Sequence, residues 1–178
     1  MKSKNVRQGT KMLALSAVLS ALGVVLLVIG SFLSALDLTM VAFASILVYF
    51  AVLEMGNPYQ YLIYAVTSVI SLMILPDKFA AFLYLIFGGI YPVLKKHFEK
   101  LTTAMSWVLK LLYFNAVITV MVIGAKYLFG VDDENFAVPL YALGNFSFIA
   151  YDLAMTRLLT MYLYRIRKKL KVEKYFKK

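Results

Sequence analysis

The sequence lacks cysteine, contains one histidine and is only 16% charged. Without cysteine the chain forms no disulfide and has no thiol nucleophile or thiolate metal site. The histidine, His97, lies in the basic run 95–100, which we interpret as a solvated loop rather than a metal or catalytic site. No phosphate loop, dinucleotide fingerprint or hydrolase nucleophile motif occurs. We therefore expect no enzymatic activity, no bound metal and no cofactor.

Hydrophobic residues are what the chain has in excess. They make up 62% of its 178 residues, whereas soluble domains are about 45–50% apolar. A soluble chain of this length cannot hide so much apolar surface in one core, so lipid is its natural solvent. The net charge of +10 is concentrated at the two ends of the chain, with eight basic residues in 165–178 and four in 2–11. This distribution favours a membrane orientation signal over nucleic-acid binding.

Six apolar stretches follow one another, each with the length of a helix that crosses roughly 30 Å of hydrocarbon. Because the runs are long and do not alternate with polar residues, they predict helices rather than a β-barrel. We interpret the first as a retained helix, since it exceeds the apolar core of about 7–15 residues in a signal peptide. We predict an all-α integral membrane protein with one transmembrane domain over 1–178 that ends in a basic cytoplasmic tail, 165–178. The predicted spans are 10–32, 38–55, 59–75, 79–94, 105–129 and 138–164.

The basic residues also predict the orientation of these spans. One side of the membrane collects the basic segments 2–11, 95–100 and 165–178. The other side has only Lys78 and Lys126, together with most of the acidic loop residues. Because loops rich in Lys and Arg stay in the cytoplasm, we expect both termini there. An even number of spans, six, satisfies this arrangement.

Several polar residues fall at membrane depth, where such groups are costly unless they are paired. They are Glu54, Lys110, Asn115, Asp152 and Arg157. One interpretation is that the charged members pair with one another inside the helix bundle and orient the helices. The alternative is that Asp152 or the asparagines contact a ligand or relay protons.

Small residues line part of the first span. Ala14, Ala17 and Ala21 share one helix face, and Ser16 and Ser20 share an adjacent one. Small residues four apart let a neighbouring helix approach closely. The partner is either another helix of this chain or another subunit, and the sequence leaves both open.

The layout is similar to a known family. A basic N-terminus leads into the run 11–21 with its Ala17-xxx-Ala21 pattern, a short outer loop leads through 35–44 into the second span, and Gly144-Asn145-Phe146 and Tyr151-Asp152-Leu153 occur in the last span. Six helices in this order resemble the substrate-binding S components of energy-coupling factor (ECF) transporters, which import vitamins and micronutrients. The resemblance implies docking of Ala17 and Ala21 on a transmembrane coupling subunit.

The resemblance also implies a function and a place for the substrate. The chain would be a binding subunit in a bacterial plasma membrane that works with separate coupling and ATP-binding subunits. Its substrate region, the loop after the first helix and the outer parts of helices four to six, contains Asp37, Tyr84, Lys126, Tyr141 and Asn145. No pattern identifies the substrate. The inner polar residues Glu54, Lys110 and Asp152 depart from the family's site, and they suit a structural role or one in toppling and coupling. The same six-helix fold occurs in a rod-shape-determining membrane protein family that transports nothing, which is the alternative.

Overall fold

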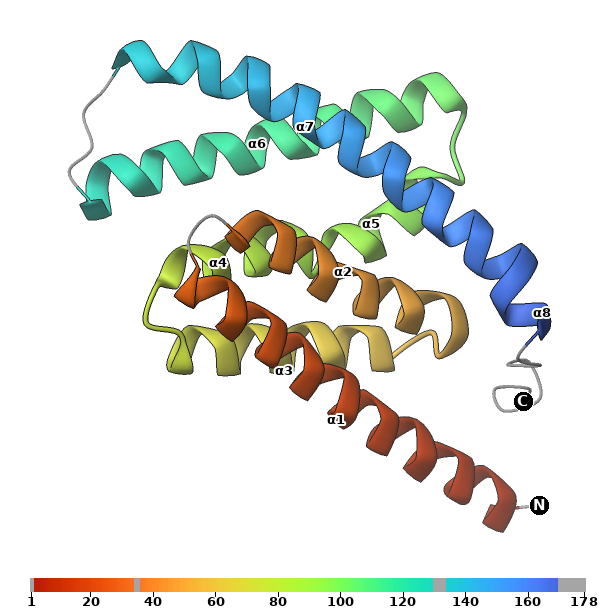
Figure 1. The fold of residues 1–178 in the computed structure, drawn as a ribbon. Coiled ribbons are helices and arrows are strands. Elements are labelled where there is room, and N and C mark those ends of the chain that lie inside the picture. The colour runs from red at the N-terminus through yellow and green to blue at the C-terminus, as the bar shows by residue number, and fades with distance from the viewer. Residues whose placement is uncertain (1, 34–35, 130–133, 170–178) are drawn as a thin grey trace. The chain divides into compact units, whose positions relative to one another are not determined.

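The computed structural model describes residues 2–33, 36–129 and 134–169. Every regular element in these ranges is a helix (Figure 1). The chain divides into two compact units, Met1–His97 and Phe98–Lys178. The prediction of an all-helical chain is therefore confirmed for the described residues, and each unit is described below by itself.

The first unit contains three long helices and one interrupted helix. The long ones are α1 (Lys2–Phe32), α2 (Asp37–Glu54) and α3 (Tyr59–Ile74). The interrupted one consists of α4 (Lys78–Leu83), the π-helical turn η2 (Tyr84–Gly88) and α5 (Tyr91–Phe98). Helix α1 packs against both α2 and α3 (Figure 1).

The turns of this unit follow from their residues. Gly56 ends α2 with a φ of 69°, and its N–H donates to the carbonyl oxygen of Ala51 over 2.9 Å. Glycine suits this position because it adopts positive φ without steric cost. At the next turn, the Asp77 carboxylate accepts from the N–H of Phe79 and so caps the start of α4. The neighbouring Lys78 ammonium donates to the carbonyl oxygens of Leu72 and Leu75, at 2.8 and 2.6 Å, and so closes the end of α3.

Close contacts between helices rest on small residues. A Cβ atom added to Gly23 of α1 would lie 3.0 Å from Cγ2 of Thr67 on α3. The Thr67 hydroxyl donates to the carbonyl oxygen of Ser20 over 3.3 Å. A Cβ on Gly88 would lie 2.6 Å from Cγ1 of Val41 on α2. Glycines at these points let the helix backbones approach closely, as in membrane helix packing.

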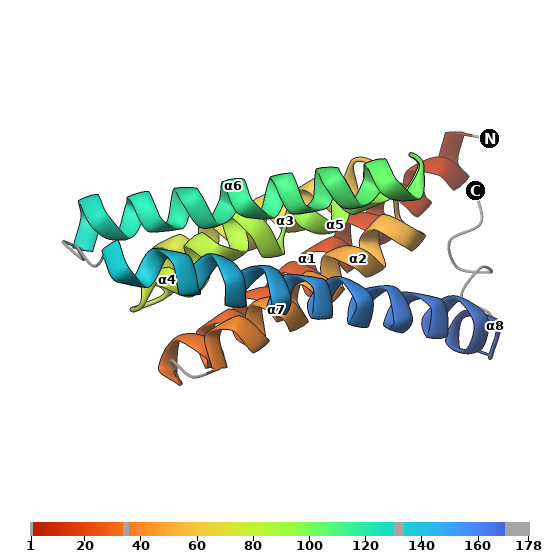
Figure 2. The ribbon, with the colours of Figure 1, turned by 90° about the horizontal axis from the view of Figure 1, so that it is seen from above.

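The second unit is a helix pair. Helix α6 (Thr103–Phe129) and helix α7 (Glu134–Met161) contact each other; α7 crosses α6 at an angle in Figure 1, and both can be followed from above in Figure 2. A π-helical turn, η3 (Tyr162–Ile166), and the short α8 (Arg167–Lys169) continue α7. Pro139 lies inside α7.

Large apolar side chains point outward in both units. Met73, Leu38 and Ile74 are exposed in the first unit, and Phe146 and Leu112 in the second. Several hydroxyl-bearing side chains are buried beside the apolar core; among them are Ser16, Ser20, Thr67, Ser68 and Ser71. Soluble proteins rarely expose so much apolar surface, whereas lipid-facing helices require it.

Several predicted boundaries differ from the structure. The first helix begins at Lys2 rather than at residue 10, and the fourth continues to Phe98 rather than ending at 94. The basic run that we interpreted as a solvated loop is therefore partly helical, and Lys95 within it is 1% exposed. The loop interpretation is wrong for Lys95, because four apolar residues before it keep that turn of α5 inside the unit. The last helix includes 165–169 of the predicted tail.

Candidate functional site

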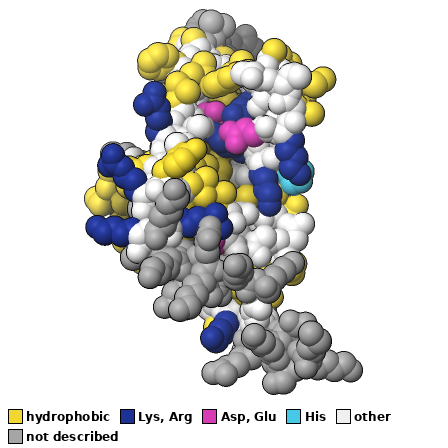
Figure 3. Space-filling model, turned by 90° about the vertical axis from the view of Figure 1, so that its right-hand side faces the viewer, with side chains coloured by type: hydrophobic (Ala, Val, Ile, Leu, Met, Phe, Trp, Pro, Cys, Tyr) yellow, Lys and Arg dark blue, Asp and Glu magenta, His cyan; other side chains and the backbone are white. Residues whose placement is uncertain are grey.

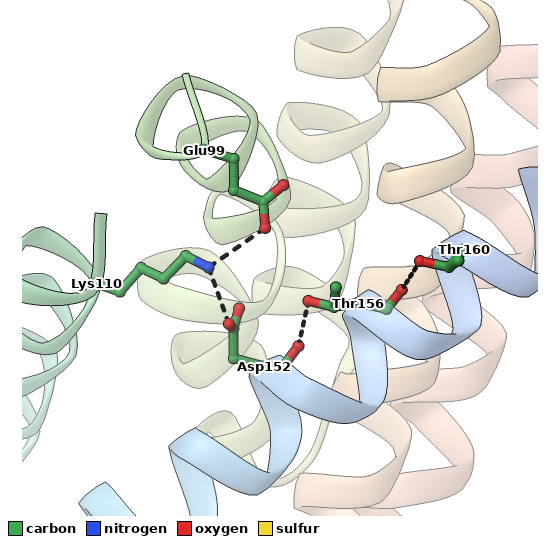
Figure 4. Close-up of polar contacts among 5 residues, drawn as sticks. All are labelled: Glu99, Lys110, Asp152, Thr156 and Thr160. Carbon is green, nitrogen blue, oxygen red and sulfur yellow. Dashed lines mark hydrogen bonds and ion pairs between the residues drawn. The ribbon is translucent and has the colours of Figure 1, made fainter. Parts of the chain in front are cut away.

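A buried lysine of the second unit contacts two carboxylates (Figure 4). The Nζ atom of Lys110 on α6 lies 2.9 Å from Oδ2 of Asp152 on α7 and 3.3 Å from Oε1 of Glu99. The side chains of Lys110 and Asp152 are 6% and 2% exposed, whereas that of Glu99 is 44% exposed. The ammonium also lies 5.2 Å from the ring centre of Trp107, within the range of a cation–π contact. One lysine is thus held by a buried carboxylate, a half-exposed carboxylate and an aromatic face.

The register of the helix pair brings Lys110 and Asp152 together. One turn further along α6, Phe114 stacks on Phe148, which lies one turn earlier on α7, with ring centres 4.4 Å apart. Residues four apart occupy the same helix face, so the two pairs form successive rungs of one antiparallel contact. The aromatic pair lies one helix turn from the ion pair, and Phe148 within it is buried.

A second polar rung follows. The side-chain amides of Asn115 and Asn145 donate to each other's carbonyl oxygens over 3.0 Å in both directions. The hydroxyls of Thr119 and Tyr141 lie 2.7 Å apart, one turn further on. Polar groups on lipid-embedded helices are satisfied by such contacts between helices. The structure therefore places Tyr141 and Asn145, two candidate substrate residues, in contact with α6.

Two threonines extend the line of hydrogen bonds from Asp152, but they do not extend the charged group. The Thr156 hydroxyl donates to the backbone carbonyl of Asp152 over 2.8 Å, and that of Thr160 donates to the carbonyl of Thr156 over 2.7 Å (Figure 4). Both are local bonds within one helix turn. Each of these two bonds ends on a backbone carbonyl oxygen of α7.

The other candidate polar residues are on different helices or in other contacts. Glu54 is buried at the end of α2, in the first unit. Arg157 is exposed on α7, and Asn115 belongs to the amide rung rather than to the ion pair. Among the described residues, no group of three or more His, Cys, Asp or Glu side chains is placed to hold a metal ion.

A second buried polar group lies in the first unit, around Tyr84. This tyrosine, in η2, is 1% exposed, and a side-chain hydrogen bond joins it to Thr67 of α3. Its ring lies against Gly88 and Gly89, where a Cβ atom would come within 3.3 and 2.9 Å of it. The ring of Tyr64 fills the other side of Gly89, and its hydroxyl donates to the carbonyl of Leu85 over 3.0 Å. The two glycines thus make room for two tyrosine rings beside the π-helical turn.

Asp37 belongs to the same unit. It begins α2, is 4% exposed, and lies one turn before Val41, which contacts Gly88. The structure therefore brings two predicted substrate residues, Asp37 and Tyr84, to neighbouring turns. Lys126 lies near the end of α6, and its side chain is outside the described residues.

Helix α1 has two distinct faces, which separates the two interpretations of its small residues. The face with Ser16, Ser20 and Gly23 is buried. Ala14, Ala17 and Ala21 are exposed, together with Val18 and Val25. The described helices of the first unit thus do not pack on the alanine face.

Three contacts escape sequence reasoning. Glu99 follows a run of basic residues, and nothing in its spacing indicates that it folds back to Lys110. Thr119 looks like an ordinary helix residue until α7 places Tyr141 opposite it. The Thr-Ser-xx-Ser spacing of 67–71 on an apolar helix indicates a buried polar stripe, but it does not indicate which residues Thr67 contacts.

Charged side chains also mark the surface. Figure 3 shows Lys and Arg side chains at several places on one face, with an acidic group among them and apolar side chains between. In the first unit, the Lys96 ammonium lies 3.5 Å from the carbonyl oxygen of Val52, so the basic end of α5 lies beside the end of α2. The acidic residues Asp37 and Asp77 interact electrostatically at the turns where α2 and α4 begin. Lys95 and Lys96 thus lie at the end of α5 and Asp37 and Asp77 where α2 and α4 begin, while Lys78 adjoins Asp77 and Glu54 ends α2.

These features define a class of protein. Four helical segments are long and apolar enough to cross a membrane, namely Gln8–Phe32, Asp37–Glu54, Lys78–Phe98 and Thr103–Gly124, and Tyr59–Ile74 is a shorter apolar helix. Together with the exposed apolar side chains, they are typical of an all-helical membrane protein. Comparison of the chain with protein-family models, with curated proteins and with solved structures finds no match.

Proposed function

We propose that the protein is the non-catalytic, substrate-binding S component of an ECF-type importer in a bacterial plasma membrane. It would cross the membrane six times with both termini in the cytoplasm, bind a vitamin or other small micronutrient outside, and work with separate coupling and ATP-binding subunits. The proposal counts α3 and α7 as membrane spans in addition to the four long apolar helices. Helix α3 has 16 residues, a rise of about 24 Å. Helix α7 carries Asp152, whose charge is balanced by Lys110.

The exposed alanine face of α1 is the observation that carries the proposal. In lipid, helices associate through small residues that let backbones approach, whereas large apolar side chains are adequate for contact with lipid. Ala17 and Ala21 are exposed while the opposite face of the same helix packs on α3 through Gly23 and Ser20. A stripe of alanines that no other helix of the first unit covers suits a helix of another subunit.

The sorted charges support the proposed orientation. Asp37, Asp77 and the capping Lys78 lie at the helix ends assigned to the outside. Lys95, Lys96 and Lys100 lie at the end of α5 and just after it, which are assigned to the inside. Basic residues stay in the cytoplasm, so this sorting favours a cytoplasmic N-terminus.

Co-purification tests the proposal. Ala17→Trp places a bulky ring on the alanine face and should abolish recovery of a transmembrane coupling subunit with the tagged chain. Leu22→Trp is the matched control: Leu22 is 48% exposed on the same helix, but about 140° around the axis from Ala17, so this variant should retain the complex. Equal recovery from Ala17→Trp and wild type would refute docking through this face. Wild type that recovers no coupling subunit would favour the rod-shape-determinant alternative.

A further inference from the structure

The carboxylate of Asp37 is buried without a complete set of partners. Its residue is 4% exposed, and its Oδ1 atom has no hydrogen-bond partner among the described residues. Leu36, which precedes it, offers α2 no side-chain cap. An ionised carboxylate removed from water is strongly unfavourable unless a positive or hydrogen-bonding group compensates it.

The groups around Asp37 add negative rather than positive charge. Asp77, at the turn before α4, interacts electrostatically with Asp37 as a like charge. Lys78 follows Asp77, but its ammonium donates to the carbonyl oxygens of Leu72 and Leu75. On α1, a Cβ added to Gly30 would lie 3.4 Å from Oδ1 of Asp37. The Asp37 carboxylate thus lies near Gly30, which has no side chain to contact it, and interacts with a second carboxylate, that of Asp77.

Further unpartnered oxygens lie deeper in the same unit. The hydroxyl oxygens of Ser71 and Ser68 on α3 are buried and have no hydrogen-bond partner among the described residues. Ser71 lies one turn from Thr67 on the same helix face, and Thr67 in turn meets Tyr84 and Ser20. The first unit therefore offers the hydroxyl oxygens of Ser68 and Ser71 as hydrogen-bond acceptors in addition to the buried carboxylate of Asp37.

We propose that Asp37 binds the ammonium group of a small organic cation, and that this cation is the solute of the proposed importer. The chemistry is that of a charge-assisted hydrogen bond: an N–H of the ammonium donates to Oδ1, and its charge compensates the carboxylate. Taking the cation as the transported solute rests on the proposed function. The competing structural role is that the Asp37 charge merely stabilises the N-terminus of α2 through the helix dipole.

Thermal unfolding of the purified full chain, with methylammonium chloride as the probe and sodium chloride at equal ionic strength as the reference, separates these roles. Methylammonium should raise the Tm of wild type. Asp37→Asn removes the buried charge, so it should have a higher Tm than wild type in sodium chloride and a methylammonium affinity lower by about tenfold or more. Asp77→Asn, which removes the neighbouring exposed carboxylate, should keep the response. Asp37→Glu should retain part of it.

Two outcomes overturn the proposal. One is an Asp37→Asn variant that responds to methylammonium as wild type does. The other is a wild type that does not respond, with a lower Tm for Asp37→Asn in sodium chloride, as a helix-dipole role predicts. The measurement needs no partner subunit, so its failure is distinguishable from failure of the proposed function. A methylammonium response in a protein that recovers no coupling subunit would support the cation site and refute the importer function. Recovery of a coupling subunit by a protein that does not respond to methylammonium would refute the cation site alone.

Discussion

The Nζ atom of Lys110 lies 2.9 Å from Oδ2 of Asp152, although the two residues are 42 positions apart in the chain. Each charge is nearly removed from solvent, so each depends on the other. A pair of this kind favours one register of α6 against α7, because a shift of either helix by one residue would separate the two buried charges. We infer that its main role is structural.

Breaking this pair should destabilise the protein strongly. Asp152→Asn leaves the Lys110 ammonium without its buried partner, and we expect a loss of about 3–5 kcal/mol in the free energy of unfolding. Lys110→Met should cost a similar amount. The double variant Lys110→Met/Asp152→Asn, which removes both charges, should recover most of the loss. Denaturant titration of the four proteins in detergent gives the double-mutant cycle.

Glu99 provides the matched control for this cycle. Its side chain is 44% exposed and contacts the same ammonium, so Glu99→Gln should cost less than about 1 kcal/mol. Equal costs for Glu99→Gln and Asp152→Asn would show that burial does not set the strength of the pair.

Two glycines, Gly89 in the first unit and Gly124 in the second, should differ in how well they tolerate an added methyl group. A Cβ on Gly89 would collide with the rings of Tyr64 and Tyr84, so Gly89→Ala should destabilise by about 1–3 kcal/mol. A Cβ added to Gly124 of α6 would meet no atom within 4 Å. Gly124→Ala should therefore be neutral or stabilise the protein by up to about 1 kcal/mol, because alanine has the higher helix propensity. Thermal unfolding of both variants checks this contrast. Destabilisation by Gly124→Ala as large as that by Gly89→Ala would contradict it.

The six-span topology can be tested because the chain has no cysteine of its own. Single cysteines at Pro76, Lys100 and Lys169 probe three helix ends. In intact cells, a membrane-impermeant maleimide should label Pro76→Cys alone, and after permeabilisation it should label all three. Opposite accessibility of Lys100→Cys and Lys169→Cys would mean that α6 and α7 together cross the membrane an odd number of times, and would refute six spans.

Sequence reasoning reaches the helices more easily than the contacts between them. Long apolar runs predict helices, and the low frequency of charge inside them places Asp152 among the candidate partners of Lys110. Glu99 and Lys95 escape because charged residues near a helix end ordinarily face water. Their true environment depends on how the chain folds back, which local pattern does not encode.

Helix α1 shows the same limit from another side. Small residues occupy two of its faces, one with Ser16 and Ser20 and one with Ala17 and Ala21. The residue types alone do not distinguish a helix face that packs within the chain from one that is available to bind another subunit. Burial does, because the serine face meets α3 while the alanine face stays exposed. Asp37 is a comparable case: its position at a helix start is evident in the sequence, but the unpartnered Oδ1 is not.

The docking role of α1 is tested most directly by site-specific cross-linking in native membranes. A cysteine introduced at Ala21 and carrying a photoactivatable maleimide should cross-link to a transmembrane coupling subunit, identified by mass spectrometry. The same label at Leu22, which is exposed on the same helix but turned about 100° away, should give little or no such product. No protein cross-link from Ala21→Cys, or equal yields from both positions, would contradict the proposed docking face.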